Sequence, residues 1–216
     1  MDVKQVCEDL KELNPLVKVM LEAALKDIKK KGVEANIVET YRPKERQYYL
    51  YGQGRSVAEC IKGGVPSAKA KLYARSGVEV TWTLDSIHIK RKAVDVIAQR
   101  NGNAIWNAKD KDSQVIIASM IKYGFEAGVK WASNPDSPHY QVDCEMDDVF
   151  TKSKNTKEVT IVIQKALGKA LNKKVITDGR WGDETTKLVN EFRKKQKWLP
   201  TGSVGASCLK RLLTYL

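Results

Sequence analysis

The sequence predicts an α+β domain, in which helices pack against a small, mainly antiparallel sheet, followed by a small three-helix bundle. Two observations predict this order. Helical stripes and short β-type runs are interspersed over residues 1–150, whereas only helical stripes follow from residue 158 onward. The chain has 216 residues, of which 42% are hydrophobic and 30% charged, and this globular composition excludes disorder as the main state.

The first 50 residues predict two helices with a strand between them. Asn14 and Pro15 form a cap and a first-turn proline, apolar residues follow at helical spacing, and Gly32 ends the helix. Residues 33–41 contain β-branched and aromatic side chains and predict a strand. A second helix is expected over 43–50.

The middle of the chain is less regular. Residues 55–77 are rich in Gly, Lys and Ala without a clean period, and we expect a mobile excursion there. Residues 78–84 predict a strand. Two apolar runs, 93–98 and 104–106, flank Asn101-Gly102 and predict a β-hairpin, because both turn residues tolerate positive φ.

A helix and a final strand complete the predicted domain. Asp112 is the expected cap of a helix that Gly124 ends, and residues 139–143 predict the strand.

Three amphipathic stripes follow, over 159–171, over 188–192 after an expected cap at Asp183, and over 209–216. The polar run 151–157 lies before the first of them and is typical of a linker. We therefore expect a domain at 1–150, a linker at 151–157 and a three-helix domain at 158–216.

The positive charge is concentrated in the last third of the chain. Residues 151–216 contain 15 Lys and Arg against 5 Asp and Glu, whereas residues 1–150 contain 23 against 21. Such a basic module suits an anionic envelope polymer, a nucleic acid or an acidic surface, and a merely soluble lysine-rich face has the same composition.

Membrane insertion and a disulfide framework are both disfavoured. The longest apolar run has seven residues, far below the ~18 that a membrane-spanning helix needs, and no secretory signal pattern is visible near Met1. The four cysteines, Cys7, Cys60, Cys144 and Cys208, are too widely spaced for a zinc motif or a small disulfide scaffold. We expect free thiols and folding in the cytosol.

Candidate chemistry centres on the two histidines of the chain, His88 and His139. Asp95 lies among Val and Ile side chains in a predicted strand, where a carboxylate needs a partner or a metal. If the strands that carry Asp95 and His139 are neighbours, two imidazoles and one carboxylate converge, which is a ligand set of catalytic zinc. Asp136 would then be a spare carboxylate that accepts a proton. Taken singly, each histidine is also compatible with a core or surface position.

Four stretches of the sequence form an ordered pattern. They are Glu39-Thr40-Tyr41-Arg42-Pro43 with 46–55, Val80-Thr81-Trp82-Thr83, Ser86-x-His88-x4-Ala93-x-Asp95, and Gly124-Phe125-Glu126 through Trp131 to 136–141. This pattern resembles that of zinc peptidases of the L-alanyl-D-glutamate endopeptidase type, which are found among phage endolysins and bacterial cell-wall enzymes and are related to the D-alanyl-D-alanine carboxypeptidases.

This resemblance implies a role for each candidate. The family's zinc ligands fall on His88, Asp95 and His139, and its catalytic base falls on Asp136. Arg42 matches an arginine that polarises or holds the substrate, with a surface ion pair as the alternative. A further match, Ser86, corresponds to a pocket serine, for which local hydrogen bonding is the alternative.

The sequence also departs from the family pattern. Arg91 stands where the family usually has glycine, Ala127-Gly128-Val129-Lys130 stands where Trp-Gly-Gly-Asp is usual, and residues 56–79 form a longer stretch than in compact members. We expect these differences at the rim of the cleft, where they affect which bond is cut.

Residues 158–216 resemble the three-helix peptidoglycan-binding module, through 178–186, the helix 189–196 and the turn 199–205. The two resemblances together imply a phage endolysin that uses Zn²⁺ to hydrolyse a stem-peptide amide of bacterial peptidoglycan. It would be a monomer that waits in the host cytoplasm until lysis and binds no nucleic acid. A D-alanyl-D-alanine carboxypeptidase and a non-catalytic protein that binds wall polymer or nucleic acid are the alternatives.

Overall fold

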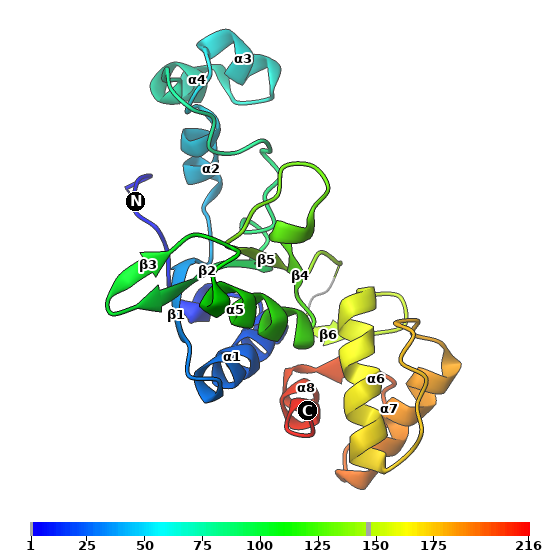
Figure 1. Cartoon of the computed structure of the whole chain (residues 1–216). Helices are drawn as coiled ribbons and strands as arrows, with labels where there is room; N and C mark the ends of the chain where they lie inside the picture. Colours follow the sequence, from blue (N-terminus) through cyan, green and yellow to red (C-terminus); the bar gives the residue numbers. More distant parts are fainter. Residues whose placement is uncertain (1, 146–147) are drawn as a thin grey trace.

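The computed structural model describes residues 2–145 and 148–216. Its centre is an antiparallel sheet in the order β1-β2-β5-β4, with β3 paired to β2 (Figure 1). The strands are β1 (Glu34–Glu39), β2 (Ala93–Arg100), β3 (Asn103–Ile105), β4 (Glu126–Ala127) and β5 (His139–Gln141). The predicted α+β class is confirmed.

Two helices, α1 (Pro15–Lys30) and α5 (Lys111–Lys122), cover one face of the sheet. The β2 residues Val94, Val96 and Ala98 share the main core with these helices. Because side chains alternate along a strand, the residues between them face the other way. The second face of the sheet is therefore free to carry a site.

The expected ends of α1 agree with the structure. The side chain of Asn14 accepts a hydrogen bond from the Leu16 N–H at 2.9 Å, and Pro15 is the first helical residue. Gly32, at φ +75°, follows the helix. For α5 the cap differs from the expectation, since Asp110, and not Asp112, caps the helix by accepting from the Asp112 N–H at 2.8 Å.

The predicted hairpin is present. Strands β2 and β3 pair antiparallel around Asn101 and Gly102, whose φ angles are +52° and +78°. Asn and Gly are the residues that adopt this pair of positive φ angles most readily, so the turn follows directly from the sequence.

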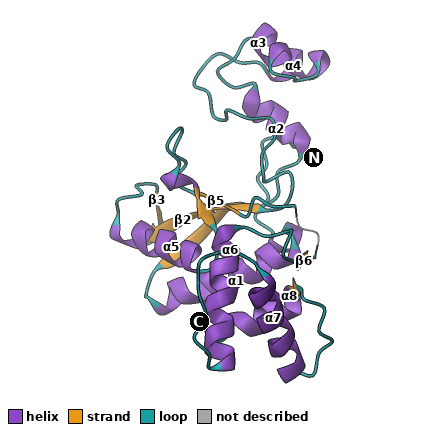
Figure 2. Ribbon diagram, turned by 90° about the vertical axis from the view of Figure 1, so that its right-hand side faces the viewer, coloured by secondary structure: helices purple, strands orange, loops and turns teal. Residues whose placement is uncertain are grey.

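Residues 44–75 form a projection that we call the arm (Figure 2). It contains α2 (Lys44–Tyr51), α3 (Val57–Lys62) and α4 (Ser67–Tyr73). The sequence did not predict α3 and α4, which lie within the stretch 55–77 that was expected to be a mobile excursion. Ser56 and Glu59 form a capping box that starts α3. A small apolar cluster of its own, comprising Cys60, Val65 and Ala70, joins α3 to α4.

The strand expected over 78–84 is also absent. This stretch is irregular and pairs with no strand, and Val78 and Trp82 are 82% and 56% exposed. It is held instead by Gln47 of α2, whose amide nitrogen donates to the Thr83 carbonyl at 2.6 Å and to the Thr81 hydroxyl at 3.2 Å. The β-type side chains of Val78, Val80 and Trp82 alternate along this stretch because they point to solvent, and the stretch itself belongs to no sheet.

The C-terminal part is helical as expected. It comprises α6 (Lys157–Leu171), α7 (Asp183–Lys195) and α8 (Ala206–Leu213). Gly182, and not Asp183, occupies the cap position of α7. The short strand β6 (Val149–Phe150), which precedes α6, pairs antiparallel with β7 (Val204–Gly205), which precedes α8.

The bundle packs directly on the rest of the molecule. Helix α8 lies against α1, and one continuous apolar core includes residues of α1, the central sheet and all three C-terminal helices. Gly124 shows how close the approach is, since a Cβ there would lie 3.0 Å from Met20 and 3.3 Å from Val159. The domain boundaries at 150 and 158 stay a prediction.

Two short 3-10 helices, η1 (Leu10–Glu12) and η2 (Gly128–Lys130), complete the fold. All four cysteines are free, as expected, with Cys60 and Cys208 buried. Within the described part of the chain, no helix has the length and apolar character that crossing a membrane requires.

Candidate active site

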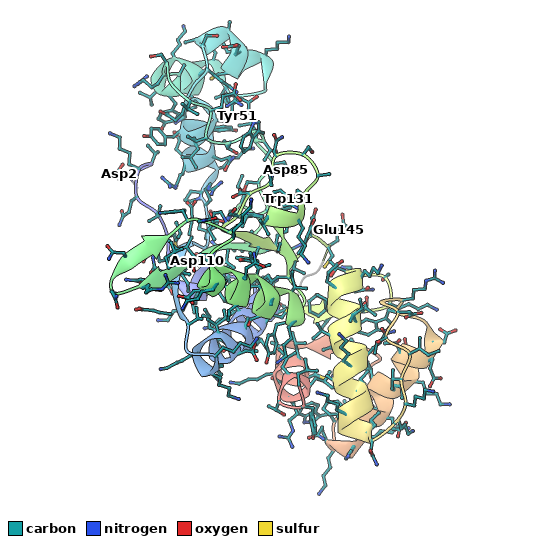
Figure 3. All side chains as sticks on the ribbon, in the orientation of Figure 1. Asp2, Tyr51, Asp85, Asp110, Trp131 and Glu145 are labelled. Atoms are coloured by element: carbon teal, nitrogen blue, oxygen red, sulfur yellow. The ribbon has the colours of Figure 1, made fainter. Side chains whose placement is uncertain are left out.

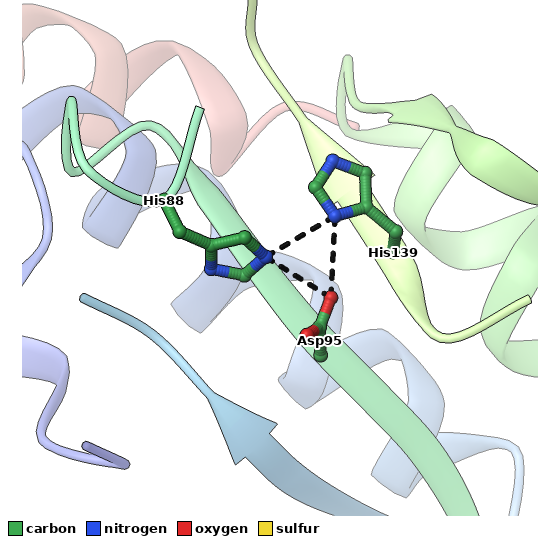
Figure 4. A group of neighbouring side chains, drawn as sticks. All are labelled: His88, Asp95 and His139. Carbon is green, nitrogen blue, oxygen red and sulfur yellow. Dashed lines mark hydrogen bonds and ion pairs between the residues drawn. The ribbon is translucent and has the colours of Figure 1, made fainter. Parts of the chain in front are cut away.

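Three side chains from separate segments meet on the face of the sheet that α1 and α5 leave open (Figure 4). Asp95 Oδ1 lies 3.2 Å from His88 Nε2 and 3.2 Å from His139 Nδ1, and the two imidazole nitrogens are 3.2 Å apart. His88 and His139 are 1% and 7% exposed. The structure thus brings together the three residues that the sequence singled out.

Strand register explains this convergence. In the β2–β5 pair, Asp95 lies directly opposite His139. His88 reaches the same point from the turn that precedes β2, where its N–H is 3.4 Å from the Ser86 hydroxyl oxygen. Residues 89–92, which lie between His88 and the start of β2, therefore form a turn that brings His88 back over the strand that carries Asp95.

Both imidazoles present a lone pair to the centre when neutral. His88 Nδ1 lies 2.7 Å from the Thr40 carbonyl oxygen, which only accepts hydrogen bonds, so Nδ1 carries the proton and Nε2 does not. His139 Nε2 lies 3.0 Å from Gln141 Oε1, also an acceptor, so Nδ1 is the bare nitrogen. Three acceptor atoms thus face one another, and this arrangement requires a cation between them.

The electrostatics of these three side chains agree with this requirement. Burial would raise the pKa of Asp95, but its contacts with the imidazoles of His139 and His88 outweigh burial and lower that pKa well below its ordinary value. For His139, burial works against protonation, yet Asp95 raises the pKa of the ring above its ordinary value. Asp95 therefore favours a positive charge beside the His139 ring.

The donor set fits Zn²⁺. Two imidazole nitrogens and one carboxylate oxygen, with no thiolate, form the three-ligand set of catalytic zinc sites. The ligand atoms of His88, Asp95 and His139 all lie within 4.8 Å of one another, and the three side chains are buried or half-buried.

Below the three ligands lies a network of buried ion pairs. Arg42 donates through Nε and Nη2 to Glu39 Oε2, at 2.9 and 2.5 Å, and through Nη1 to Gln47 Oε1 at 3.0 Å. Arg46 Nε donates to the other Glu39 oxygen at 2.7 Å. Arg42 Nη2 is also 3.6 Å from Asp95 Oδ2. Arg42 is therefore fixed from below, and it still borders the cleft.

The ligands form the floor of a cleft of about 780 Å³. Its walls are the irregular stretch 78–85, the His88 turn and the loop 131–136. Asp85 and Trp131 belong to two of these walls, and Figure 3 shows both between the central sheet and the arm. The cleft residues named by the sequence analysis are Arg42, Ser86, His88, Asp95, Asp136 and His139.

Asp136 is the candidate proton acceptor in this cleft. Burial, followed by the negative charge of Asp95, raises its pKa above the ordinary value of an aspartate. A raised pKa makes the carboxylate a stronger base, which suits proton transfer near neutral pH. Gly128 allows the tight turn here, because a Cβ at that position would lie 2.6 Å from the Asp136 carbonyl oxygen.

Ser86 lies in the cleft wall and is 7% exposed. Its hydroxyl oxygen faces the His88 N–H, and its carbonyl accepts from the Ile89 N–H at 3.0 Å. These contacts are the local hydrogen bonding expected for a residue that shapes the His88 turn, and they leave its role toward a substrate a prediction.

Among proteins of described function, the peptidoglycan L-alanyl-D-glutamate endopeptidase CwlK of Bacillus subtilis (strain 168) is 30% identical over 139 residues. These residues make up 61% of this chain and 74% of CwlK. The chain belongs to this endopeptidase family. Because CwlK is a peptidoglycan endopeptidase, membership of its family makes the chain a peptidoglycan hydrolase. No family model matches the chain.

Two solved structures are also similar to the chain. The L-Ala D-Glu endopeptidase ChiX of Serratia marcescens is 22% identical with a TM-score of 0.41, covering 62% of this chain and 83% of ChiX. The LD-carboxypeptidase LdcB is 20% identical with a TM-score of 0.39, and the match covers 60% of this chain and 58% of LdcB.

One departure from the endopeptidase family pattern now has a physical reason. Arg91, in place of the usual glycine, has φ +62°, a conformation that glycine adopts without strain. Its guanidinium pairs with the Glu12 carboxylate and stacks 3.9 Å from the centre of the Tyr41 ring. These contacts compensate for the strained backbone. They also direct Arg91 away from the cleft, contrary to the expectation that it would border it.

Sequence reasoning missed several side chains that support the site. Glu39 and Gln47 lie in stretches that match the family, but the sequence predicted no role for either, although both contact Arg42. Gln141 on β5 contacts His139, and Glu126 on β4 contacts Gln141. The available signal was strand alternation, since Gln141 is two residues from His139 and therefore on the same face.

Proposed function

We propose that this protein is a zinc-dependent peptidoglycan peptidase that hydrolyses the L-alanyl-D-glutamate bond of the stem peptide. The observation that carries the proposal is the convergence of three acceptor atoms, from His88, Asp95 and His139, at 3.2 Å on the floor of the cleft. The choice of bond is supported by the similarity to CwlK.

The three ligand residues would hold the zinc. When bound, Zn²⁺ supplies the Lewis acidity that polarises an amide carbonyl and makes a water molecule more acidic. The chain's own residues supply the remaining functions of the site, which are proton transfer, charge stabilisation and exclusion of bulk water.

Asp136 would move the proton. As a carboxylate with a raised pKa at the edge of the three ligands, it accepts a proton from the attacking water and returns it to the nitrogen of the leaving amine. The bond that breaks is the peptide C–N bond, and the products are a carboxylate and an amine.

Arg42 would stabilise negative charge in the cleft. Three of its five N–H groups donate to Glu39 and Gln47, and this fixes the plane of the guanidinium before any substrate arrives. Arg42 Nη2 also lies 3.6 Å from Asp95 Oδ2, and Arg42 lines the cleft, where negative charge would develop on the carbonyl oxygen of the substrate. Ser86, in the wall of the cleft, would make one further contact with the substrate.

For the C-terminal bundle we propose wall binding. The excess of ten positive charges in residues 151–216, which comprise the bundle and the segment before it, favours an anionic envelope. Salt should weaken this attraction, because the Debye length falls to about 3 Å at 1 M ionic strength. The setting that we propose is host lysis by a monomeric phage endolysin that reaches the wall from the host cytoplasm.

The experiment is mass analysis of fragments released from purified peptidoglycan by metal-depleted and zinc-restored protein. New L-alanine carboxyl ends and D-glutamate amino ends, formed only with zinc, are the expected result. Release of free D-alanine would replace the proposal by the carboxypeptidase alternative. The absence of any zinc-dependent product would leave a binding protein.

A further inference from the structure

A row of polar side chains crosses three strands beside the proposed zinc ligands. Asp95 on β2 is paired with His139 on β5, and Gln141 on β5 is paired with Glu126 on β4. Because His139 and Gln141 are two residues apart, the row lies on one face of the sheet. Register alone therefore places Glu126 one side chain away from a ligand.

Hydrogen bonds along this row have a fixed direction. A carboxylate only accepts, so Gln141 must point its NH₂ group at Glu126, and this bond is 2.8 Å long between Nε2 and Oε2. The Gln141 carbonyl oxygen is then turned toward His139, 3.0 Å from Nε2. The imidazole must donate from Nε2, which leaves its Nδ1 bare.

We propose that Glu126 is a positioning residue which, through the amide of Gln141, fixes the proton of His139 on Nε2 and so directs the Nδ1 lone pair at the cation. The inference rests on the zinc site of the proposed function. Without Glu126 the Gln141 amide can rotate, and its NH₂ group would then favour a proton on Nδ1, where it blocks the ligand atom.

The second oxygen of Glu126 extends the row to the cleft wall. The Trp131 indole N–H donates to Glu126 Oε1 at 2.7 Å, and the Trp131 ring lies 5.2 Å from the His139 ring, centre to centre. Trp131 lines the cleft. One carboxylate thus orients both a ligand and the aromatic side chain beside it.

His88 provides an internal contrast. Its tautomer is set by the backbone carbonyl of Thr40, which no side-chain substitution removes. The tautomer of His139 depends instead on two side chains, and one of them, Glu126, is exposed. The two histidines should therefore respond differently to the same variant.

The test compares Glu126→Leu and Glu126→Gln with the control Glu34→Leu, which alters an exposed glutamate on β1, the opposite edge strand of the sheet. Zinc affinity is measured by competition with a chelator. Glu126→Leu should bind zinc roughly 10- to 100-fold more weakly, as for other groups that orient ligands. Glu126→Gln should recover most of the affinity, because its carbonyl oxygen still accepts from Gln141.

A second readout is independent of activity. Imidazole ¹⁵N spectra of the metal-free protein at alkaline pH should show the Nε2–H form of His139 in the wild type and a mixture in Glu126→Leu, with His88 unchanged. Wild-type affinity together with an unchanged His139 spectrum in Glu126→Leu would overturn the inference. So would an equal loss of affinity in Glu34→Leu, because the effect would then belong to the sheet in general.

The two proposals fail in different ways. If the wild-type protein binds no zinc, the proposed function is wrong. If the wild type binds zinc and Glu126→Leu binds it equally well, only the role of Glu126 is wrong.

Discussion

The open face of the sheet and the C-terminal bundle are built in opposite ways. Around the three proposed ligands the molecule buries Glu39, Arg46 and Gln47 together with the histidines. In residues 151–216, all of which are described, the buried polar side chains are Thr160, Gln164 and Thr185, and the rest of the core is apolar. Among the described residues, the buried acidic and basic side chains thus lie near the site, while the bundle carries its acidic and basic side chains on the surface.

The polar face therefore provides the reactive groups, whereas the apolar bundle contributes to the stability of the fold. Burying paired ions contributes little net stability, whereas the loss of one partner of such a pair is strongly destabilising. The free energy that keeps the site folded must therefore come from apolar packing elsewhere in the molecule. The bundle provides such packing, because its apolar core is continuous with that of α1 and the sheet. Variants in the two regions should therefore differ in what they change.

The largest effect is expected for Asp136→Asn. Removal of the proton acceptor should lower kcat by about 10²- to 10⁴-fold, the usual contribution of general acid–base catalysis, while zinc binding and thermal stability stay near wild type. The measurements are stem-peptide turnover, zinc content and thermal unfolding.

The matched control is Asp148→Asn, which changes an exposed aspartate outside the cleft lining and should keep wild-type turnover. Loss of zinc from Asp136→Asn would show that Asp136 is a ligand, and full activity would show that it is not the base.

In the bundle, Leu209→Ala should act on stability alone. Leu209 is 1% exposed on α8, in the shared core, and its truncation should cost about 2–5 kcal/mol of unfolding free energy. Because the core is continuous, circular dichroism and tryptophan fluorescence should report one transition at a lower temperature.

Leu199→Ala is the corresponding control, since Leu199 is 79% exposed and its loss should have little effect. Two separate transitions in Leu209→Ala, with the sheet unaffected, would show that the bundle is an independent unit.

A smaller effect is expected for Asp27, which joins α1 to α5. Burial would raise its pKa, but Lys31 and Lys122, at 2.6 and 2.9 Å, and the Ser119 hydroxyl at 2.8 Å together lower it. A folded-state pKa below the unfolded value adds stability above the unfolded pKa of about 4, and this stability is lost as the pH falls.

Asp27→Asn should therefore cost about 1 kcal/mol at pH 7, a value that allows for the partial exposure of both lysines. The difference from wild type should shrink as the pH falls below 4. Asp85→Asn, which breaks a more exposed pair with Lys90, should cost less. A constant difference for Asp27→Asn from pH 7 to pH 2 would contradict the ion-pair explanation.

Local signals in the sequence were sufficient for most elements. Asn14-Pro15, Asn101-Gly102 and the apolar stripes of α6 and α8 predicted structure that is present, because caps, turns and periodicity act within a few residues. The stretch 78–84 was misread because its β-type residues are exposed beside Gln47, a contact that spans more than 30 residues of sequence.

The proposed ligands could be identified because each was chemically out of place. Asp95 interrupts an apolar strand, and histidine occurs only twice in the chain. Glu126 and Glu39 could not be recognised in this way, since a glutamate at an edge strand or a strand end is ordinary. Their importance depends on strand register and on the direction of hydrogen bonds, which only the folded arrangement provides.

The central claim is that His88, Asp95 and His139 form one cation site, and calorimetric titration of the metal-depleted protein with zinc tests it most directly. We predict one zinc per chain for the wild type, with binding lost in His88→Ala and the fold retained. Absence of zinc binding by the folded wild type, or equal binding by His88→Ala, would contradict the account.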